Sequence, residues 1–320
     1  MKKFISIILT IILVFSLFSI VSCGNKDDDT TVRIATLNGT TGFGLAYLME
    51  QNANDNSTNK YEFTIESDAS VVQSLIISGD VDMAALPTNA ASALFNKTKD
   101  IEIIAINTLG VLYLIENGNS IQNMSDLDGK TIYCPAQNPT FILKYLLEKY
   151  EIDATIDSTT YAAPADLRTA VATNLVDIAV LPEPMVTIAT KANSNLRVAI
   201  DLTEAWDEVE QEGSLVQGCI VARKDFIENH PEIVEKFLDE YKVSIEYLNQ
   251  NVSDSASLVA KYKIFENENV AKLAIPKCNV AFIEGDEMKT AMEKFLQAMY
   301  SVNPKSIGEK LPTDDFYYKR

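Results

Sequence analysis

Four short polar segments hold the residues best suited to chemistry, and each lies between an apolar run typical of a buried strand and a predicted helix. They span 38–42, 87–89, 137–140 and 182–184. Free main-chain N–H groups and the helix dipole at such junctions favour an anionic or hydrogen-bond-accepting group. Taken singly, each segment is more simply interpreted as a helix cap, because Thr, Asn and Gly begin many helices. As a set they predict a binding site formed by Asn38, Gly39, Thr40, Thr41, Gly42, Thr88, Asn89, Gln137, Asn138, Thr140 and Glu183.

Glu183 lies between Pro182 and Pro184, directly after an apolar run. The two prolines remove two main-chain donors and stiffen the segment, so the carboxylate is held in place. Such a carboxylate accepts a hydrogen bond from a ligand N–H or pairs with a cation. The alternative is a charge in the first turn of a helix. We predict that Glu183 contacts a ligand that carries an N–H donor or a partial positive charge.

The four segments contain neither Arg nor Lys. A strongly charged anion usually recruits Arg as a bidentate partner. The absence of such a residue favours a neutral or nitrogen-rich ligand, or an anion that is held by main-chain N–H groups alone. Arg168 and Arg223 are the possible exceptions.

Five aromatic residues are candidates for stacking on a ligand ring, although aromatic side chains more often belong to a core. Trp206 stands out because its neighbours Glu204, Asp207 and Glu208 are acidic, which favours a position on the rim of the cleft. We therefore add Trp206 to the candidate ligand-binding residues. The other aromatic candidates are Phe43, Tyr113, Phe141 and Tyr161.

The composition argues against several classes of protein. The 320 residues carry a formal net charge of −18, which argues against a nucleic-acid partner because phosphate backbones are repelled. One histidine, His230, and four widely spaced cysteines fit neither the common zinc centres nor a disulfide framework. Cys134, Cys219 and Cys278 are expected to be small buried residues. The P-loop, nucleophile-elbow and HExxH motifs do not occur. We predict no catalytic residue, metal or cofactor, and therefore not an enzyme.

Two stretches of the sequence repeat in the same order. Val81–Pro87 (VDMAALP) returns as Val176–Pro182 (VDIAVLP), and Phe43–Glu50 returns as Phe141–Glu148 at nearly the same offset. The alternative is that buried strands and apolar helices resemble one another by composition. A period this long predicts two duplicated lobes rather than a solenoid. Because parallel sheets bind ligands beyond the carboxyl ends of their strands, the duplication directs the four segments to one cleft.

Each copy alternates strands with helices, which predicts an α/β fold whose lobes are each a mostly parallel sheet flanked by helices. From Pro231, apolar residues that recur every four positions predict one long helix. This C-terminal third has no counterpart in the second copy, and we expect it to pack on the first lobe after 214–223 has crossed between lobes. The predicted strands are 31–37, 61–65, 81–86, 101–107, 131–134 and 176–181, and the predicted helices are 69–78, 89–97, 140–150 and 164–173.

The N-terminus predicts export. Two lysines precede the apolar run 4–21, and Ile20–Cys23 follows the pattern of a bacterial lipobox, in which a small residue precedes the cysteine. An uncleaved membrane anchor is the alternative, because the run is nearly long enough to cross a bilayer. We predict a signal peptide over 1–22, a lipid on Cys23 and a polar tether over 23–30. The mature protein would then lie on the extracytoplasmic face of the cell membrane.

Several motifs together resemble the solute-binding lipoproteins of bacterial ABC importers, in particular the nitrate, sulfonate, taurine and thiamine-pyrimidine-precursor family (NMT1-like, SsuA-like). The resemblance implies a two-lobed, type II periplasmic-binding-protein-like fold that traps a small organic solute, such as a thiamine-precursor-like pyrimidine or a sulfonate. It implies a permease and an ATPase as partners, and we expect a monomer held at the membrane by Cys23. The motifs are Ile20–Cys23, Gly39–Ala46, Gly79–Asn89, Leu181–Pro184, Val221–Phe226 and Ser306–Pro312.

Lobe 1 is predicted to comprise 31–109 and 219–320, and lobe 2 to comprise 110–218. We expect the lobes to close on a ligand about hinges near 108–111 and 218–220, since both segments connect the second copy to the rest of the chain. Two alternatives stay open. One is an enzyme on the same scaffold, of menaquinone-pathway type, against which the export signal argues. The other is a surface sensor or adhesin that retains the binding fold.

Overall fold

The computed structural model describes residues 30–320. The predicted signal peptide, the lipidation site Cys23 and all of the predicted tether except Thr30 lie outside the described residues. Residues 32–320 form one compact unit. Within the described part of the chain, no helix is both long enough and apolar enough to span a bilayer. Nor does that part contain a group of three or more His, Cys, Asp and Glu side chains that could hold a metal ion.

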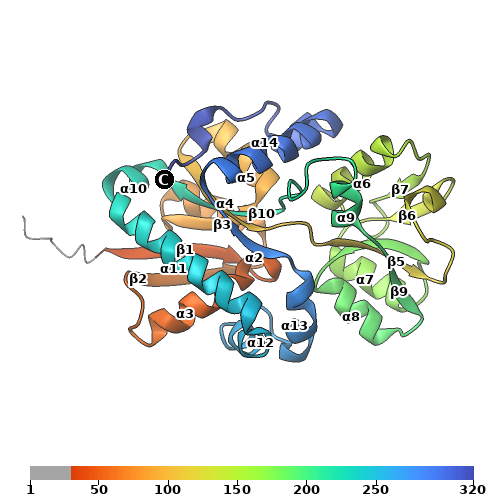
Figure 1. Ribbon diagram of the computed structural model, residues 1–320, viewed down its shortest axis with the longest axis horizontal. Coiled ribbons are helices and arrows are strands. Elements are labelled where there is room, and N and C mark those ends of the chain that lie inside the picture. Colours follow the sequence, from red (N-terminus) through yellow and green to blue (C-terminus); the bar gives the residue numbers. More distant parts are fainter. Residues whose placement is uncertain (1–29) are drawn as a thin grey trace, which may run out of the picture. The chain divides into compact units, whose positions relative to one another are not determined.

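The strands form two sheets (Figure 1), and the strand orders of the two sheets correspond. Sheet A has the order β11-β4-β10-β3-β1-β2, and sheet B, read in the same sense, has the order β9-β5-β8-β6-β7. The repeated stretch VDMAALP/VDIAVLP thus contributes equivalent strands, β3 and β8. Sheet A contains β1 (Thr31–Leu37), β2 (Lys60–Glu66), β3 (Met83–Pro87), β4 (Ile101–Thr108), β10 (Gly218–Arg223) and β11 (Val280–Ile283). Sheet B contains β5 (Leu112–Asn117), β6 (Thr131–Tyr133), β7 (Thr155–Asp157), β8 (Ile178–Pro182) and β9 (Leu196–Asp201).

Helices connect these strands, and a helical block follows β10. The connecting helices are α2 (Thr40–Phe43), α3 (Ala46–Ala53), α4 (Ala69–Ser78), α5 (Thr88–Thr98), α6 (Asn138–Lys149), α7 (Pro164–Ala172), α8 (Met185–Ala192) and α9 (Leu202–Asp207). The C-terminal block contains α10 (Lys224–Asn229), α11 (Pro231–Gln250), α12 (Val252–Lys261), α13 (Glu268–Ala274) and α14 (Gly285–Val302). Short 3-10 helices are η1 (Met124–Leu127), η2 (Ile275–Lys277), η3 (Pro304–Ile307) and η4 (Asp314–Phe316).

The predicted elements occur at or within a few residues of their expected bounds. The strand over 31–37 and the helix over 69–78 have the bounds that the sequence predicts, and Gly79 ends α4 in the left-handed conformation with φ 79°. The long helix begins at Pro231 as expected, and its apolar stripe is buried. Cys134, Cys219 and Cys278 are free and buried, which confirms the expectation of small core residues.

The two-lobed α/β fold is confirmed, but the sheets are mixed rather than mostly parallel. Strand β10 pairs antiparallel with both β3 and β4, and β5 pairs antiparallel with both β8 and β9. The pairs β1·β3, β6·β7 and β6·β8 are parallel. The physical reason is that β5 and β10 begin directly after the chain has crossed between the sheets. Each therefore enters the new sheet against the direction of its neighbours.

One residue bonds the two crossing segments together. The main-chain N–H of Gln217 donates to Thr108 O (2.9 Å), and its main-chain oxygen accepts from the N–H of Thr88 (3.3 Å). Its side-chain Oε1 accepts from the N–H of Val111 (2.7 Å). Gln217 thereby joins the outgoing segment, the returning segment and the start of α5. The lobe boundaries and hinges proposed from the sequence stay predictions.

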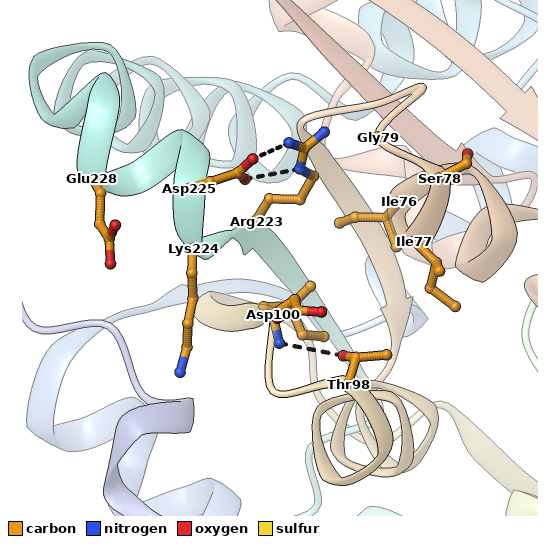
Figure 2. Close-up of a pocket in the computed structure, with 11 residues that line it drawn as sticks. Ile76, Ile77, Ser78, Gly79, Thr98, Asp100, Arg223, Lys224, Asp225 and Glu228 are labelled. Atoms are coloured by element: carbon orange, nitrogen blue, oxygen red, sulfur yellow. Dashed lines mark hydrogen bonds and ion pairs between the residues drawn. The ribbon is translucent and has the colours of Figure 1, made fainter.

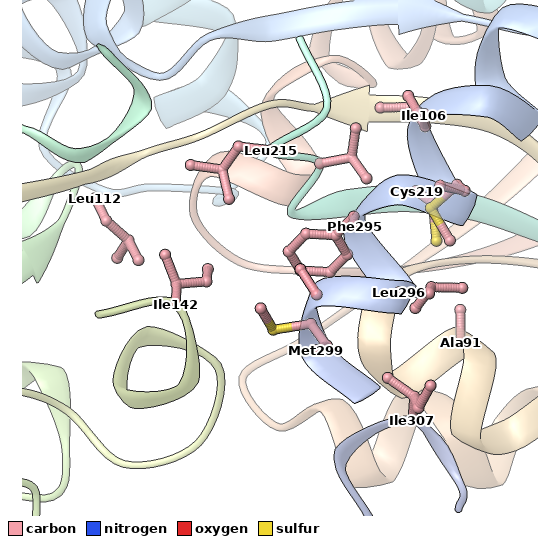
Figure 3. Close-up of a cluster of buried hydrophobic side chains, with 14 of the residues drawn as sticks. Ala91, Ile106, Leu112, Ile142, Leu215, Cys219, Phe295, Leu296, Met299 and Ile307 are labelled. Atoms are coloured by element: carbon pink, nitrogen blue, oxygen red, sulfur yellow. The ribbon is translucent and has the colours of Figure 1, made fainter. Parts of the chain in front are cut away.

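The C-terminal block packs on sheet A, as expected, but α14 also contacts α6 beside sheet B. Helices α11 and α12 pack on α3. Phe295 and Met299 of α14 belong to the same buried apolar cluster as Ile142 of α6 and Leu112 of β5. This cluster extends continuously from the helices of sheet A to those of sheet B (Figure 3).

The bonds between Asp82 and Arg33, which join the start of β3 to β1, can be tested by substitution. The repeat-equivalent residue Asp177 provides the matched control. The Asp82 carboxylate accepts from the main-chain N–H of Arg33 (3.0 Å) and from Nε (3.0 Å) and Nη2 (2.5 Å) of the same residue. Asp82→Asn should lower the free energy of unfolding by about 1–3 kcal/mol, because charge-assisted hydrogen bonds to a buried acceptor are weakened. Asp177, the repeat-equivalent residue, is exposed, and Asp177→Asn should change stability by less than about 0.5 kcal/mol. Urea denaturation of both variants measures this difference, and equal effects would contradict it.

Candidate functional site

A cavity of about 600 Å³ lies where two of the four predicted segments meet. Segment 38–41 follows β1 in sheet A, and segment 182–184 ends β8 in sheet B, so residues from both sheets line one space. The hydroxyl of Thr40 donates to the main-chain oxygen of Glu183 (3.0 Å), which joins the two segments directly. The lining residues are Asn38, Gly39, Thr40, Thr41, Val111, Pro164, Pro182, Glu183, Pro184, Met185, Lys263, Ile264, Phe265, Glu266 and Asn267.

The β1–α2 turn requires its glycines. Gly39 has φ 87° and ψ −156°, a conformation that side chains with a Cβ rarely adopt. A Cβ on Gly42 would lie 2.5 Å from Leu37 O. The turn is also bonded to the C-terminal block, because the N–H of Gly39 donates to Ile264 O (2.9 Å). These contacts hold 38–42 against the wall of the cavity, although Gly42 itself is buried and does not line it.

The Glu183 carboxylate lies beside the cavity but is fully enclosed. Its oxygens accept from the N–H (3.1 Å) and the hydroxyl (2.9 Å) of Thr187 in α8, and Lys277 Nζ lies 3.9 Å from Oε1. Burial raises the pKa of Glu183 above its ordinary value, while the Thr187 hydrogen bonds and the Lys277 charge act in the opposite direction. The Thr187 contacts are made with the first turn of α8, which begins at Met185, so Glu183 lies just before the helix rather than in its first turn. Contact between Glu183 and a ligand stays a prediction.

The four segments themselves contain no basic residue, but cations reach the cavity from a distant part of the chain. Lys263 lines the cavity from the turn after α12, and its exposed side chain has no hydrogen bond or ion pair among residues 30–320. Lys277 approaches Glu183 from η2. Arg168 Nη1 lies 3.9 Å from Sδ of Met185, a lining residue. Sequence reasoning missed 263–267 because the repeat, its only guide to the cleft, does not include the C-terminal block.

The other two predicted segments do not line this cavity, and their hydroxyl groups bond to nearby main chain. Thr88 is buried and its hydroxyl donates to Val216 O (2.7 Å); Thr140 donates to Pro135 O (2.7 Å). The helices that begin at these segments, α5 and α6, have no side-chain cap. Asn89 Oδ1 and Asn138 Oδ1 are buried without a hydrogen-bond partner in the described part of the chain, whereas Gln137 is exposed. The two unpaired carboxamide oxygens keep Asn89 and Asn138 as candidate ligand contacts.

Trp206 is a core residue, so its expected position on the rim of the cleft is wrong. Its side chain is fully buried and packs between Tyr145 of α6 and Phe295 of α14, with ring centroids 5.0 and 6.0 Å away. Nε1 donates to Ser214 Oγ (2.9 Å). Among its acidic neighbours, Glu204 and Glu208 are exposed and Asp207 is half-buried, whereas the indole of Trp206 lies in the core.

The remaining aromatic candidates also have packing roles. Phe43 is fully buried and meets Phe265 edge to face, with ring centroids 6.3 Å apart. Tyr161 is partly buried against the sheet B core and lies beside Tyr133, with ring centroids 6.1 Å apart. Phe141 packs, partly buried, against the apolar cluster that contains Ile142. Tyr113 is nearly buried in that core, and its hydroxyl donates to Lys277 O (2.8 Å).

Arg223, the second possible exception, lines a different cavity (Figure 2). That cavity has a volume of about 420 Å³ and lies beside the C-terminal end of α4 and the start of β4. There Arg223 pairs with Asp225, and Lys224 Nζ lies 3.0 Å from Asp315 Oδ2. His230 precedes the first turn of α11, as expected for a capping residue, and its ring lies 5.0 Å from that of Phe226.

Trp206→Phe should lower the free energy of unfolding by about 1–3 kcal/mol, because it removes buried volume and the bond to Ser214. Tyr300→Phe is the control, since Tyr300 is an exposed aromatic residue on α14. Guanidinium denaturation followed by circular dichroism measures both variants. A Trp206→Phe protein as stable as the Tyr300→Phe protein would contradict the core position.

Comparisons with known proteins agree with this architecture. A family model described as NMT1/THI5 like matches residues 60–253, more than half of the chain. A solved ABC transporter structure from Parabacteroides distasonis is 22% identical, with a TM-score of 0.77 over 91% of this chain and 99% of that one. The periplasmic aliphatic sulphonate binding protein SsuA from Escherichia coli is 16% identical, with a TM-score of 0.69 over 88% and 92%.

The alkanesulfonate-binding protein SsuA from Xanthomonas axonopodis pv. citri, bound to MOPS, is 14% identical, with a TM-score of 0.67 over 91% of this chain and 98% of its own. The search of curated proteins finds no match. At these identities the solved structures show the fold, which is that of periplasmic binding proteins. With the family model covering most of both sheets, the chain belongs to the NMT1/THI5-like family.

Proposed function

We propose that the protein is the extracytoplasmic solute-binding lipoprotein of an ABC importer, and that it binds a small organic solute in the 600 Å³ cavity. The observation that carries the proposal is that segments from both sheets, together with Lys263, line one space. A solute that contacts both sheets favours the closed arrangement, because it gains contacts there that it cannot make when the lobes are apart. The bound protein would then deliver the solute to a permease and its ATPase.

The lining favours a small organic anion with an apolar body. Lys263 is an exposed cation without an ion pair in the described residues. The Glu183 carboxylate, in contrast, already accepts two hydrogen bonds from Thr187 and pairs with Lys277. Glu266 also lines the cavity, so the anionic group would have to lie nearer to Lys263. The apolar part of the lining is Val111, Pro164, Pro182, Pro184, Met185, Ile264 and Phe265. This proposal moves sulfonates ahead of the nitrogen-rich solutes that the sequence favoured.

Solute binding is tested by thermal shift and calorimetry with an alkanesulfonate, nitrate and an aminopyrimidine as separate probes. We expect the alkanesulfonate to stabilise the protein, with a shift that grows with its concentration. Lys263→Gln should weaken its binding about ten- to a hundredfold, the effect of losing one charged hydrogen-bond partner. Glu266→Gln, three residues away in the same turn, is the matched control and should not weaken it.

The same panel separates the two ligand classes. If the aminopyrimidine binds instead, and Glu183→Gln weakens it while Lys263→Gln does not, the ligand carries an N–H donor and the proposal of an anion is wrong. If none of the three probes shifts the unfolding temperature at millimolar concentration, these solute classes are excluded.

Lipid anchoring is proposed from the sequence alone, since Cys23 lies outside the described residues. Cys23→Ser should release the protein from the membrane fraction or leave its signal segment uncleaved, because no other side chain there can carry a thioether lipid. Fractionation and mass spectrometry of the mature N-terminus measure both. Membrane association and cleavage that are unchanged in Cys23→Ser would refute the lipid anchor.

A further inference from the structure

Apolar packing joins the two lobes on one side. Met299 and Phe295 of α14 face Ile142 of α6 and Leu215 of the returning segment (Figure 3). Trp206 packs against both Phe295 and Tyr145, which extends the same contact to α9. We call the side chains of Trp206, Phe295, Met299 and Ile142 the seam. Separating the seam would expose fully buried aromatic and aliphatic surface to water, which is strongly unfavourable.

Polar contacts join the lobes beside the cavity. The hydroxyl of Tyr113, from β5, donates to the main-chain oxygen of Lys277 in η2 (2.8 Å). The hydroxyl of Thr40, from α2, donates to the main-chain oxygen of Glu183 (3.0 Å). Each bond connects an element of sheet A to an element of sheet B. Breaking them exchanges protein hydrogen bonds for bonds to water, which costs far less than exposing the seam.

We propose that Tyr113 and Thr40 form a latch that holds the cavity closed in the free protein, and that the lobes open on the latch side while the seam stays packed. The proposal rests on the proposed function, because a latch beside the cavity controls entry and exit of the solute. It predicts that the closed state is populated without a ligand. The latch residues would then determine affinity through the closing equilibrium, since the bonds that they make are within the protein.

The hydrogen bond of Tyr113 to Lys277 can be removed without changing how the Tyr113 ring packs. The ring is buried in the core of sheet B, and only the hydroxyl reaches η2. Tyr113→Phe therefore keeps the ring and removes one hydrogen bond between the lobes. Thr40→Val removes the second bond with little change in shape, and with it the weaker contact of the same hydroxyl with Cys278 Sγ (3.7 Å). Tyr150→Phe is the matched control, because the Tyr150 hydroxyl bonds only to Ala205 O (2.9 Å) and Glu208 Oε2 (2.6 Å) among the described residues, both within the sheet B lobe.

Hydrogen–deuterium exchange of the free protein tests the latch. Tyr113→Phe and Thr40→Val should each raise amide exchange in 40–43, 183–187 and 275–278 by about two- to tenfold, the effect of losing one net hydrogen bond, and the double variant should raise it further. Amides of α6 and α14 should keep their protection, and the emission of Trp206, the sole tryptophan, should not shift. Tyr150→Phe should leave exchange in the three segments unchanged.

Three results would overturn the latch: unchanged exchange in all three segments, an equal rise in α6 and α14, or the same rise in Tyr150→Phe. Because no ligand is present, these results do not bear on solute binding. Failure of all three solute probes, with the exchange result as expected, would instead refute the proposed ligand classes and leave the latch standing.

Discussion

The hydrogen bonds of Gln217 join the parts of the structure on which the rest depends. They connect the segment that leaves sheet A, the segment that returns to it and the first turn of α5. Since β5 follows the first crossing and β10 follows the second, both sheets take their antiparallel strand from this junction. The cavity depends on it as well, because Val111, which donates to Gln217, is one of its lining residues. Misplacing either crossing would shift the strand ends that bring 38–41 to 182–185.

The two sides of the interface between the lobes differ in chemistry. The seam consists of interlocked apolar side chains, and the cavity side consists of main-chain acceptors, hydroxyl groups and a few charges. Trp206 belongs to the apolar side and does not line the cavity.

The sequence predicted the fold well because strands, helix starts and the repeat are local signals. Strand β1, helix α4 with its Gly79 cap, and the start of α11 at Pro231 follow from residues that are neighbours in the chain. The site was predicted only in part. Segments 38–42 and 182–184 adjoin the repeated stretches 43–50 and 176–182, whereas Lys263 reaches the cavity through the packing of the helical block, which no local pattern encodes. The prediction for Trp206 was wrong because it relied on a local pattern. Acidic neighbours indicate that α9 lies near the surface, but they do not determine the direction of one side chain.

The order of the strands also sets the order in which the sheets can be completed as the chain emerges. All strands of sheet B, from β5 to β9, lie between residues 112 and 201. They can therefore pair with one another before the residues that follow 201 are present. Sheet A cannot, because β10 lies between β3 and β4 and is separated from them by the whole of 109–217. Strands β3 and β4 therefore have no shared neighbour until β10 arrives, a non-local closure of the kind that slows folding. The middle of the chain could therefore complete its sheet first, whereas sheet A would be completed only when β10 pairs between β3 and β4.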